Sequence, residues 1–157
     1  QGDVILVHGD FSVIRETYNL NWSETFSLIK NCFLNVLGKE GTLIVPTFNW
    51  DFCKGKAYVH EKTRSQVGMF TNYILNDASS VRSFHPIYSF TGIGKKKYEI
   101  LNNVSKSSFG EGSVFERLHN INAKIILFNF DLGSTFVHYA EQRIGVNYRY
   151  LSSFNKF

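Results

Sequence analysis

The sequence predicts an α/β fold with a central, largely parallel sheet. Three short apolar runs, at residues 4–7, 42–45 and 123–130, have the length of strands that are buried inside such a sheet. Between the first two runs, residues 22–37 repeat apolar side chains every three or four positions, as expected for one face of a helix. A strand, a helix and a second strand in this order are typical of a βαβ unit.

The helix predicted over residues 22–37 carries its own start and stop signals. Asn21 followed by Glu24 resembles a capping box, in which each side chain accepts a hydrogen bond from the other residue's backbone. Gly38 stands where a left-handed residue commonly closes a helix. The following strand, at residues 42–45, ends at Pro46. The apolar stripe of the helix consists of Phe26, Ile29, Phe33 and Val36.

The rest of the chain continues the alternation of helices and strands. Residues 47–65 form a long irregular stretch of mixed aromatic and charged side chains, and loops of this length inside a domain are often functional. Beyond it, the patterns predict helices over residues 66–76, 95–102, 113–120 and 134–144, and strands over 87–93 and 123–130. No repeat or linker divides the sequence, so we expect residues 1–157 to form a single domain.

Composition excludes several classes of protein. The two cysteines, Cys32 and Cys53, are too few for a disulfide framework and lack the CxxC spacing of a zinc site. No apolar run reaches the roughly 20 residues of a membrane span, and no basic segment precedes the first apolar run as in a signal peptide. The net charge of +4 comes from scattered residues without a nucleic-acid-binding motif. We therefore expect a cytoplasmic protein with no membrane or nucleic-acid partner, whose basic balance suits a small anionic ligand.

The segment from Ser134 to Glu141 carries the clearest chemical signal. Ser134 is a predicted helix N-cap, and Thr135, His138 and Glu141 follow at three-residue spacing, which places them along one flank of the helix. A carboxylate one turn from an imidazole suits a general base, and a hydroxyl at a helix start suits an oxyanion. An exposed helix with an incidental His–Glu pair is the alternative. A metal site would need a third ligand, which the sequence does not show, so no metal is expected.

Polar residues also follow the predicted strands, where ligands bind in open parallel sheets. They lie at residues 8–12, 46–48 and 129–135, although many such loops bind nothing. His85 precedes Pro86, which holds it in an extended turn, so His85 either touches a ligand or shapes that turn. Residues 110–113 form a glycine-rich turn with Ser113 as an N-cap, and they lack the lysine of a P-loop.

Five short motifs, taken in order, resemble the aminoglycoside 3-N-acetyltransferase family. They are Val-His at 7–8, Gly-Thr-Leu at 41–43 with Pro-Thr-Phe at 46–48, Val-Arg-Ser-Phe-His-Pro at 81–86 with Ser-Phe at 89–90, Phe-Gly-Glu-Gly-Ser at 109–113, and Thr-Phe-Val-His-Tyr-Ala-Glu at 135–141. The resemblance implies the antibiotic N-acetyltransferase fold, a three-layer α/β/α architecture. Family members are usually longer, so we expect that the C-terminal part of the fold, beyond residue 157, is missing.

The resemblance also implies an activity. Acetyl-CoA would donate the acetyl group to an amine on a sugar, which attacks directly without a covalent enzyme intermediate. By position, His138 would be the general base, Glu141 would orient it, and Thr135 would stabilise the oxyanion. The pantetheine and phosphate site would be lined by His8, Gly9, Asp10, Phe11, Ser12, Val13, Ser83, His85 and Phe90.

Two departures bear on substrate and activity. The loop after the first strand commonly reads His-Ser-Ser in this family, whereas this chain has His8-Gly9-Asp10. Residues 142–150 resemble relatives of surface-polysaccharide biosynthesis, in which an amino sugar, including a nucleotide-linked one, is the acceptor in place of an antibiotic aminoglycoside. A catalytically inactive CoA- or carbohydrate-binding module of the same fold is the alternative function. A homodimer is compatible with either.

Overall fold

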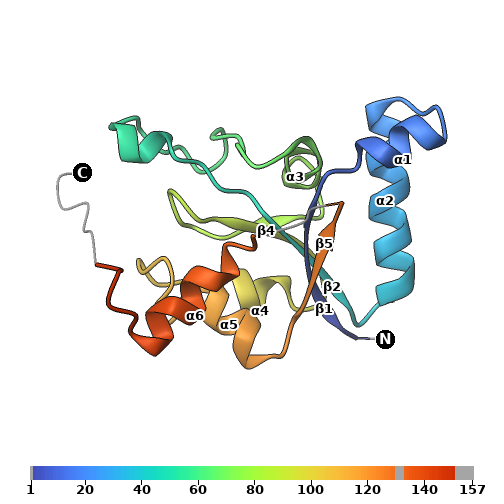
Figure 1. Cartoon of the computed structure of the whole chain (residues 1–157). Coiled ribbons are helices and arrows are strands. Elements are labelled where there is room, and N and C mark those ends of the chain that lie inside the picture. Colours follow the sequence, from blue (N-terminus) through green and yellow to red (C-terminus); the bar gives the residue numbers. More distant parts are fainter. Residues whose placement is uncertain (1, 130–132, 151–157) are drawn as a thin grey trace.

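A mixed five-stranded sheet runs through the computed structural model, which describes residues 2–129 and 133–150 (Figure 1). The strand order is β3-β4-β2-β1-β5. The strands are β1 (Val4–Gly9), β2 (Thr42–Pro46), β3 (Val81–Arg82), β4 (Phe90–Gly94) and β5 (Lys124–Phe128). Strand β1 is parallel to β2 and β5, whereas β4 is antiparallel to β2 and β3. The predicted α/β class is confirmed, with a sheet that is mixed because the short segment 83–89 makes a hairpin of β3 and β4.

Helices cover both faces of the sheet and form the three layers expected (Figure 1). The helices are α1 (Ser12–Thr17), α2 (Trp22–Leu37), the 3-10 helix η1 (Asp51–Lys54), α3 (Met69–Leu75), α4 (Lys97–Leu101), α5 (Val114–Asn120) and α6 (Phe136–Ile144). Successive strand residues point to opposite faces. Ile5 and Val7 therefore pack with α2 and α3, whereas Val4 and Leu6 pack with α4, α5 and α6. In the described part of the chain, no helix has the length and apolar character needed to cross a membrane.

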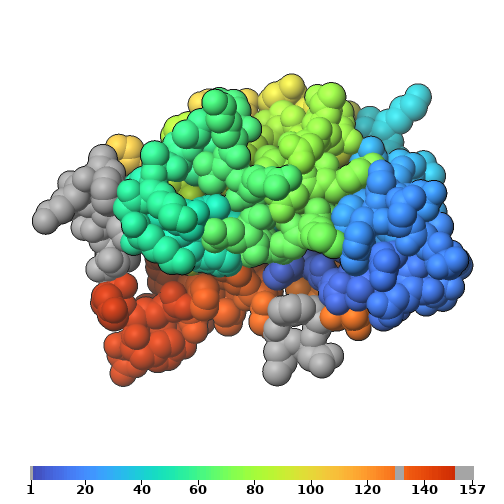
Figure 2. All heavy atoms as spheres, turned by 90° about the horizontal axis from the view of Figure 1, so that it is seen from above, coloured from blue at the N-terminus to red at the C-terminus, as the bar shows by residue number. Residues whose placement is uncertain are grey.

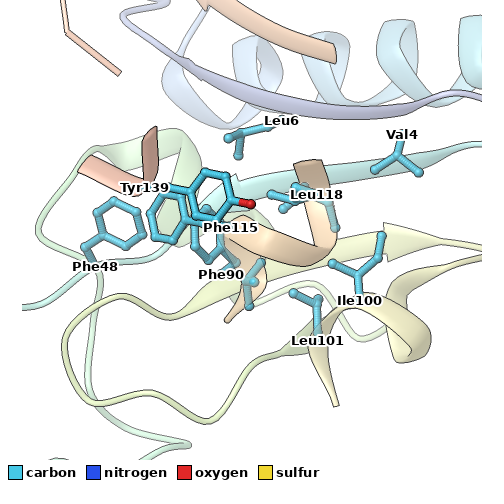
Figure 3. Packing of buried hydrophobic residues seen from close by; sticks show 11 residues of the cluster. Val4, Leu6, Phe48, Phe90, Ile100, Leu101, Phe115, Leu118 and Tyr139 are labelled. Carbon is cyan, nitrogen blue, oxygen red and sulfur yellow. The ribbon is translucent and has the colours of Figure 1, made fainter. Parts of the chain in front are cut away.

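Aromatic rings anchor α6 to the rest of the molecule (Figure 3). Tyr139 of α6 is 4% exposed and belongs to the same buried cluster as Phe48, Phe90 and Phe115. The Phe90 ring lies 5.1 Å from that of Phe48 and 4.9 Å from that of Phe115, both edge-on. Burial of each such ring stabilises the fold by about 1.5–3 kcal/mol. The residue next to Tyr139 is His138, so this core fixes the helix that carries the predicted base.

Hydrogen bonds confirm two predicted helix starts and correct a third. Asn21 and Glu24 form the capping box, with bonds of 2.9 and 3.0 Å, and the Ser113 hydroxyl accepts the Glu116 N–H. The prediction that Ser134 is the N-cap of the last helix is wrong. Thr135 occupies that position and makes no side-chain cap, because its backbone is already in the helical region, while the Ser134 hydroxyl accepts the Phe136 N–H at 3.2 Å.

Two further elements differ from the predicted boundaries. The residues after β1 were predicted as a loop, but Ser12 to Thr17 form α1. The strand predicted from residue 87 begins only at Phe90, because the N–H groups of Ile87 and Tyr88 both donate to Nδ1 of His85, at 3.1 and 2.9 Å. Those two residues therefore belong to a turn. The last predicted strand, 123–130, spans 124–128 within the described residues, and residue 130 lies outside them.

Candidate active site

A cavity of about 280 Å³ opens beyond the carboxyl end of β1. Parallel strands place their exits at one edge of a sheet, and here the β1 exit faces the start of α2 and of α3. The lining residues are His8, Gly9, Asp10, Phe11, Trp22, Phe26, Val67, Gly68, Met69 and Phe70. Four of the six residues predicted from the first loop thus share this cavity. The other two, Ser12 and Val13, lie in α1.

The geometry of Gly9 and Asp10 explains part of the altered loop. A Cβ at Gly9 would lie 2.2 Å from the backbone oxygen of Phe128, so β5 approaches too closely for any side chain there. The N–H of Asp10 donates to that same oxygen at 3.0 Å. The Asp10 carboxylate accepts the N–H and the hydroxyl of Ser12, both at 2.9 Å. The carboxylate thus organises the first residue of α1 while remaining on the rim of the cavity.

A cation stands beside this cavity. The Arg15 guanidinium of α1 lies 4.9 Å from the centre of the Trp22 ring, which lines the cavity. Among the described residues, Nε of Arg15 is buried and has no hydrogen-bond partner. A buried donor without a partner is costly, whereas the positive charge of the guanidinium still acts on the neighbouring cavity. Sequence reasoning did not single out Arg15, because one basic residue in a short helix carries no motif.

His8 links this cavity to the other face of the sheet. It is half-buried, and that burial lowers the pKa of its imidazole. His8 also lines a second, much smaller hollow of about 10 Å³, together with Thr135 at the start of α6 and Phe90 of β4. The structure therefore brings together the first predicted loop and the hydroxyl predicted to face an oxyanion.

The predicted flank of α6 is formed as its spacing indicates. Nδ1 of His138 lies 2.9 Å from Oε2 of Glu141, and the two side chains are 36% and 19% exposed. A proton on Nδ1 that is held by the carboxylate leaves Nε2 with a free lone pair. The Phe109 ring meets the imidazole edge-on, with centroids 5.6 Å apart. This arrangement fixes the orientation of the imidazole at an accessible surface.

The segment after α6 folds back onto this pair. The Tyr148 hydroxyl donates to Oε1 of Glu141 at 3.1 Å, and the Arg149 guanidinium contacts both Glu141 and Nδ1 of His138. The hydrogen bond from His138 is the main cause that lowers the pKa of Glu141, and Tyr148 and Arg149 add to it. Glu141 in turn raises the pKa of Tyr148. Neither Tyr148 nor Arg149 was predicted as a site residue, because their relation to His138 depends on the turn at Gly145.

Three predicted cofactor-lining residues are buried. The Ser83 hydroxyl accepts the Phe90 N–H at 2.9 Å, and Ser83 is fully buried. His85 is 6% exposed, accepts two backbone N–H groups on Nδ1, and has Nε2 3.4 Å from the Ser108 hydroxyl. Burial lowers the pKa of His85 to about 4, so the ring is neutral at neutral pH. Phe90 is a core residue. All three shape the turn beside the site.

Metal-binding groups are not clustered in the described residues. Across residues 2–129 and 133–150, no three His, Cys, Asp or Glu side chains are placed to hold an ion together. His138 and Glu141 pair with each other, and the Tyr148 phenol and the Arg149 guanidinium also bond to this pair. This donor set suits proton transfer.

Known proteins share this fold. A family model described as aminoglycoside 3-N-acetyltransferase matches residues 6–156. Among curated proteins, none matches the sequence. The YokD protein from Bacillus subtilis is similar in structure, with 24% identity and a TM-score of 0.77 over 91% of this chain and 64% of that one. The binary complex of AAC-IIIb with CoASH is also similar, with 18% identity and a TM-score of 0.73 over 90% of this chain and 58% of that one.

A third structure, sisomicin-bound AAC-VIa, is 14% identical and has a TM-score of 0.74 over 90% of this chain and 58% of that one. At sequence identities of 14–24%, these structures show that the chain shares their fold. The chain spans between 58% and 64% of the length of these three relatives.

Proposed function

This chain belongs to the aminoglycoside 3-N-acetyltransferase family, and from that premise we propose that it transfers the acetyl group of acetyl-CoA to an amine on a sugar. The observation that carries the proposal is the contact of 2.9 Å between His138 and Glu141 at an accessible flank of α6. A neutral imidazole with one nitrogen fixed by a carboxylate is equipped to take a proton from an attacking amine. Acetyl-CoA acts as co-substrate, and the amine acts as the nucleophile.

His138 is the proposed general base. As the amine nitrogen attacks the acetyl carbonyl and the new C–N bond forms, Nε2 of His138 removes the proton that the nitrogen must lose. Glu141 keeps Nδ1 protonated and stabilises the imidazolium that results. When the C–S bond breaks, the imidazolium returns the proton to the departing thiolate. Atoms and charge balance without a covalent enzyme intermediate, so the two bound substrates react directly.

Thr135 is the proposed oxyanion donor. Its hydroxyl stands at the N-terminus of α6, where the helix dipole also favours negative charge. Thr135 and His8 line the same hollow, so a carbonyl that reaches this hollow would approach both side chains. Removal of one such donor typically costs about 10²–10³ in rate.

The cavity at the β1 exit fits the donor substrate in two respects. Its walls are mainly apolar, which suits the pantetheine arm, and its volume of about 280 Å³ suits part of a ligand. The Arg15 guanidinium, which lies against the Trp22 ring of this cavity, supplies a positive charge that favours a phosphate group and offsets the negative charge of Asp10 on the rim. We propose that residues 8–13 and Arg15 hold acetyl-CoA, with Ser83, His85 and Phe90 shaping the adjacent turn.

Thiol release tests this function directly. The full chain is incubated with acetyl-CoA and, in turn, with amino sugars, nucleotide-linked amino sugars and aminoglycosides, while free CoA thiol is measured. We expect thiol release that requires an amine acceptor and yields an acetylated sugar. Activity with no member of these three classes would contradict the proposal.

A catalytically inactive CoA- or carbohydrate-binding module is the second candidate. The carboxylate of Asp10 on the cavity rim favours it. Isothermal titration separates the two candidates. Binding of acetyl-CoA or of an amino sugar by the folded chain, without thiol release, would support the binding module.

A further inference from the structure

We propose that Phe84, backed by His60 and Tyr58, is a stacking platform for a pyranose ring of the acceptor, at a ring other than the one that carries the reacting amine. This inference deepens the proposed function and rests on it. Phe84 is an exposed side chain between two buried ones. Phe84 is 69% exposed, whereas its neighbours Ser83 and His85 are 0% and 6% exposed. Both neighbours are fixed by hydrogen bonds to the backbone, so the turn presents Phe84 to solvent rigidly.

Phe84 is part of a cluster of three rings from two distant segments. The His60 ring stacks on it at 5.2 Å and 29°, and the Tyr58 ring meets it edge-on at 6.0 Å. The Tyr58 hydroxyl lies 3.1 Å from Nδ1 of His60. Burial and the nearby Arg82 charge lower the pKa of His60, so the ring is neutral at neutral pH and does not repel an amino sugar. We call Tyr58, His60 and Phe84 the aromatic platform.

Arg82 holds the platform in place. Its Nη1 donates to the carbonyl oxygens of His60 and Thr63 at 2.9 and 2.6 Å, and its Nη2 donates to that of Thr47 at 3.2 Å. The guanidinium also lies 5.3 Å from the centre of the Tyr58 ring. One side chain thus fixes the long loop against the strand that leads to Phe84. Because the rings are ordered before binding, a ligand loses little free energy in ordering them.

A row of rings connects His85, which follows Phe84 in the turn, with His138. His85 contacts Tyr88 at 6.1 Å, Tyr88 contacts Phe109 at 4.8 Å, and Phe109 contacts His138 at 5.6 Å. Figures 1 and 2 show the outer part of the loop between β2 and α3, in teal, on the same side of the molecule as the C-terminal part of α6. Three ring contacts separate the turn from the imidazole. We therefore place the platform beside a second sugar ring, away from the reacting one.

A pyranose ring is the occupant that this chemistry favours. Its C–H groups form an apolar face that packs on an exposed aromatic ring, while its hydroxyls remain solvated or bond to polar ring edges. Tyr58 and His60 supply such edges beside Phe84. Trp50 and Val59 of the same loop are also exposed, at 37% and 42%.

Equilibrium binding tests the platform independently of turnover. Dissociation constants of the full chain are measured for sisomicin, which has several rings, for methyl glucosaminide, which has one, for UDP-glucosamine and for acetyl-CoA. We expect Phe84→Ala to weaken sisomicin binding about 5–10-fold, to leave methyl glucosaminide and acetyl-CoA within twofold, and Phe84→Trp to restore the affinity. Tyr98→Ala is the matched control, because Tyr98 is 58% exposed on α4.

Each result has a defined meaning. Loss of affinity only for UDP-glucosamine would show that the ring stacks a nucleobase, and loss only for acetyl-CoA would assign it to the donor, so both overturn the proposal. Unchanged affinity for all ligands, or no binding of sisomicin by the wild type, would also overturn it. Selective loss of sisomicin binding in a chain that releases no thiol would support the platform and contradict the proposed catalysis.

Discussion

Nδ1 of His138 faces Oε2 of Glu141 across one turn of α6, at a distance of 2.9 Å. The contact is local, since the partners are three positions apart in the sequence, yet it depends on distant packing. Tyr139, which follows His138, is buried among the rings of β4 and α5 and sets the rotation of the helix. The opposite flank of α6 therefore presents the imidazole and the carboxylate together.

Replacement of His138 gives the first prediction. We expect His138→Ala to lower kcat by roughly 10²–10⁴-fold, the usual contribution of a general base, while acetyl-CoA binding is kept. His119→Ala is the matched control, because His119 is an exposed histidine on α5 with a ring contact to Tyr139. Thiol release and isothermal titration provide the two measurements. Wild-type turnover in the His138 variant would refute the assignment.

The ionisation of Glu141 gives the second prediction. Its pKa is lowered mainly by the hydrogen bond from His138, with smaller contributions from Tyr148 and Arg149. Because each partner stabilises the carboxylate, removing any of them raises the pKa. We expect His138→Ala, Tyr148→Phe and Arg149→Gln each to raise the pKa of Glu141. Carbon-13 NMR titration of the Glu141 carboxyl measures the shift, and an unchanged pKa in all three variants would contradict it.

Arg15 gives the third prediction. Its guanidinium lies 4.9 Å from the centre of the Trp22 ring, which lines the cavity, and its positive charge would attract a phosphate of acetyl-CoA. We expect Arg15→Gln to raise the Kd for acetyl-CoA about 10-fold and to leave the acceptor Kd unchanged. Lys39→Gln, at an exposed position beyond α2, is the control. Equal affinity of the Arg15 variant and the wild type would exclude this role.

Local signals predicted much of this fold. Neighbouring residues and the apolar pattern were enough to predict the capping box at Asn21 and Glu24 and the strands around Leu6 and Ile44. The sequence did not predict that β4 runs antiparallel to β2. This direction depends on a turn in which His85 takes two backbone N–H groups, and no pattern of apolar residues encodes that bond.

The site was predicted in part for the same reason. His138 and Glu141 lie one turn apart on α6, so their spacing alone brings them together. Arg149 reaches the pair through the turn at Gly145, and Arg82 fixes a loop that precedes it in sequence. These contacts depend on tertiary geometry. Likewise β5, whose apolar sequence resembles a central strand, lies at an edge of the described sheet with Ile125 and Leu127 about 40% and 38% exposed.

His85 gives the fourth prediction, on stability against pH. Burial lowers its pKa from 6.5 to about 4, so the unfolded chain binds a proton at pH values where the folded chain does not. The contribution of the neutral His85 to the free energy of unfolding is therefore fully present above pH 6.5. This contribution is lost as the pH falls towards 4, by about 3 kcal/mol in total. Urea unfolding across this range measures the loss. In His85→Asn, whose amide oxygen can accept the same N–H groups, we expect the loss to be smaller, and an identical pH dependence would contradict this cause.

The ion pair between Lys30 of α2 and Asp77 after α3 gives the fifth prediction. Nζ lies 2.8 Å from Oδ2, and both side chains are less than a fifth exposed. Burial opposes the ionisation of Asp77, but hydrogen bonds from Lys30 and Ser79 outweigh it and lower the pKa from 3.8 to about 2. The resulting stabilisation, about 2 kcal/mol, is present above pH 3.8 and is lost as the pH falls through about 2.

We expect Asp77→Asn to lower the free energy of unfolding at pH 7 and to change it less at pH 2.5. Lys56→Gln removes an exposed ion pair with Asp51 and should have little effect at either pH. An equal loss in the two variants at pH 7 would show that the partial burial of the Lys30–Asp77 pair adds nothing.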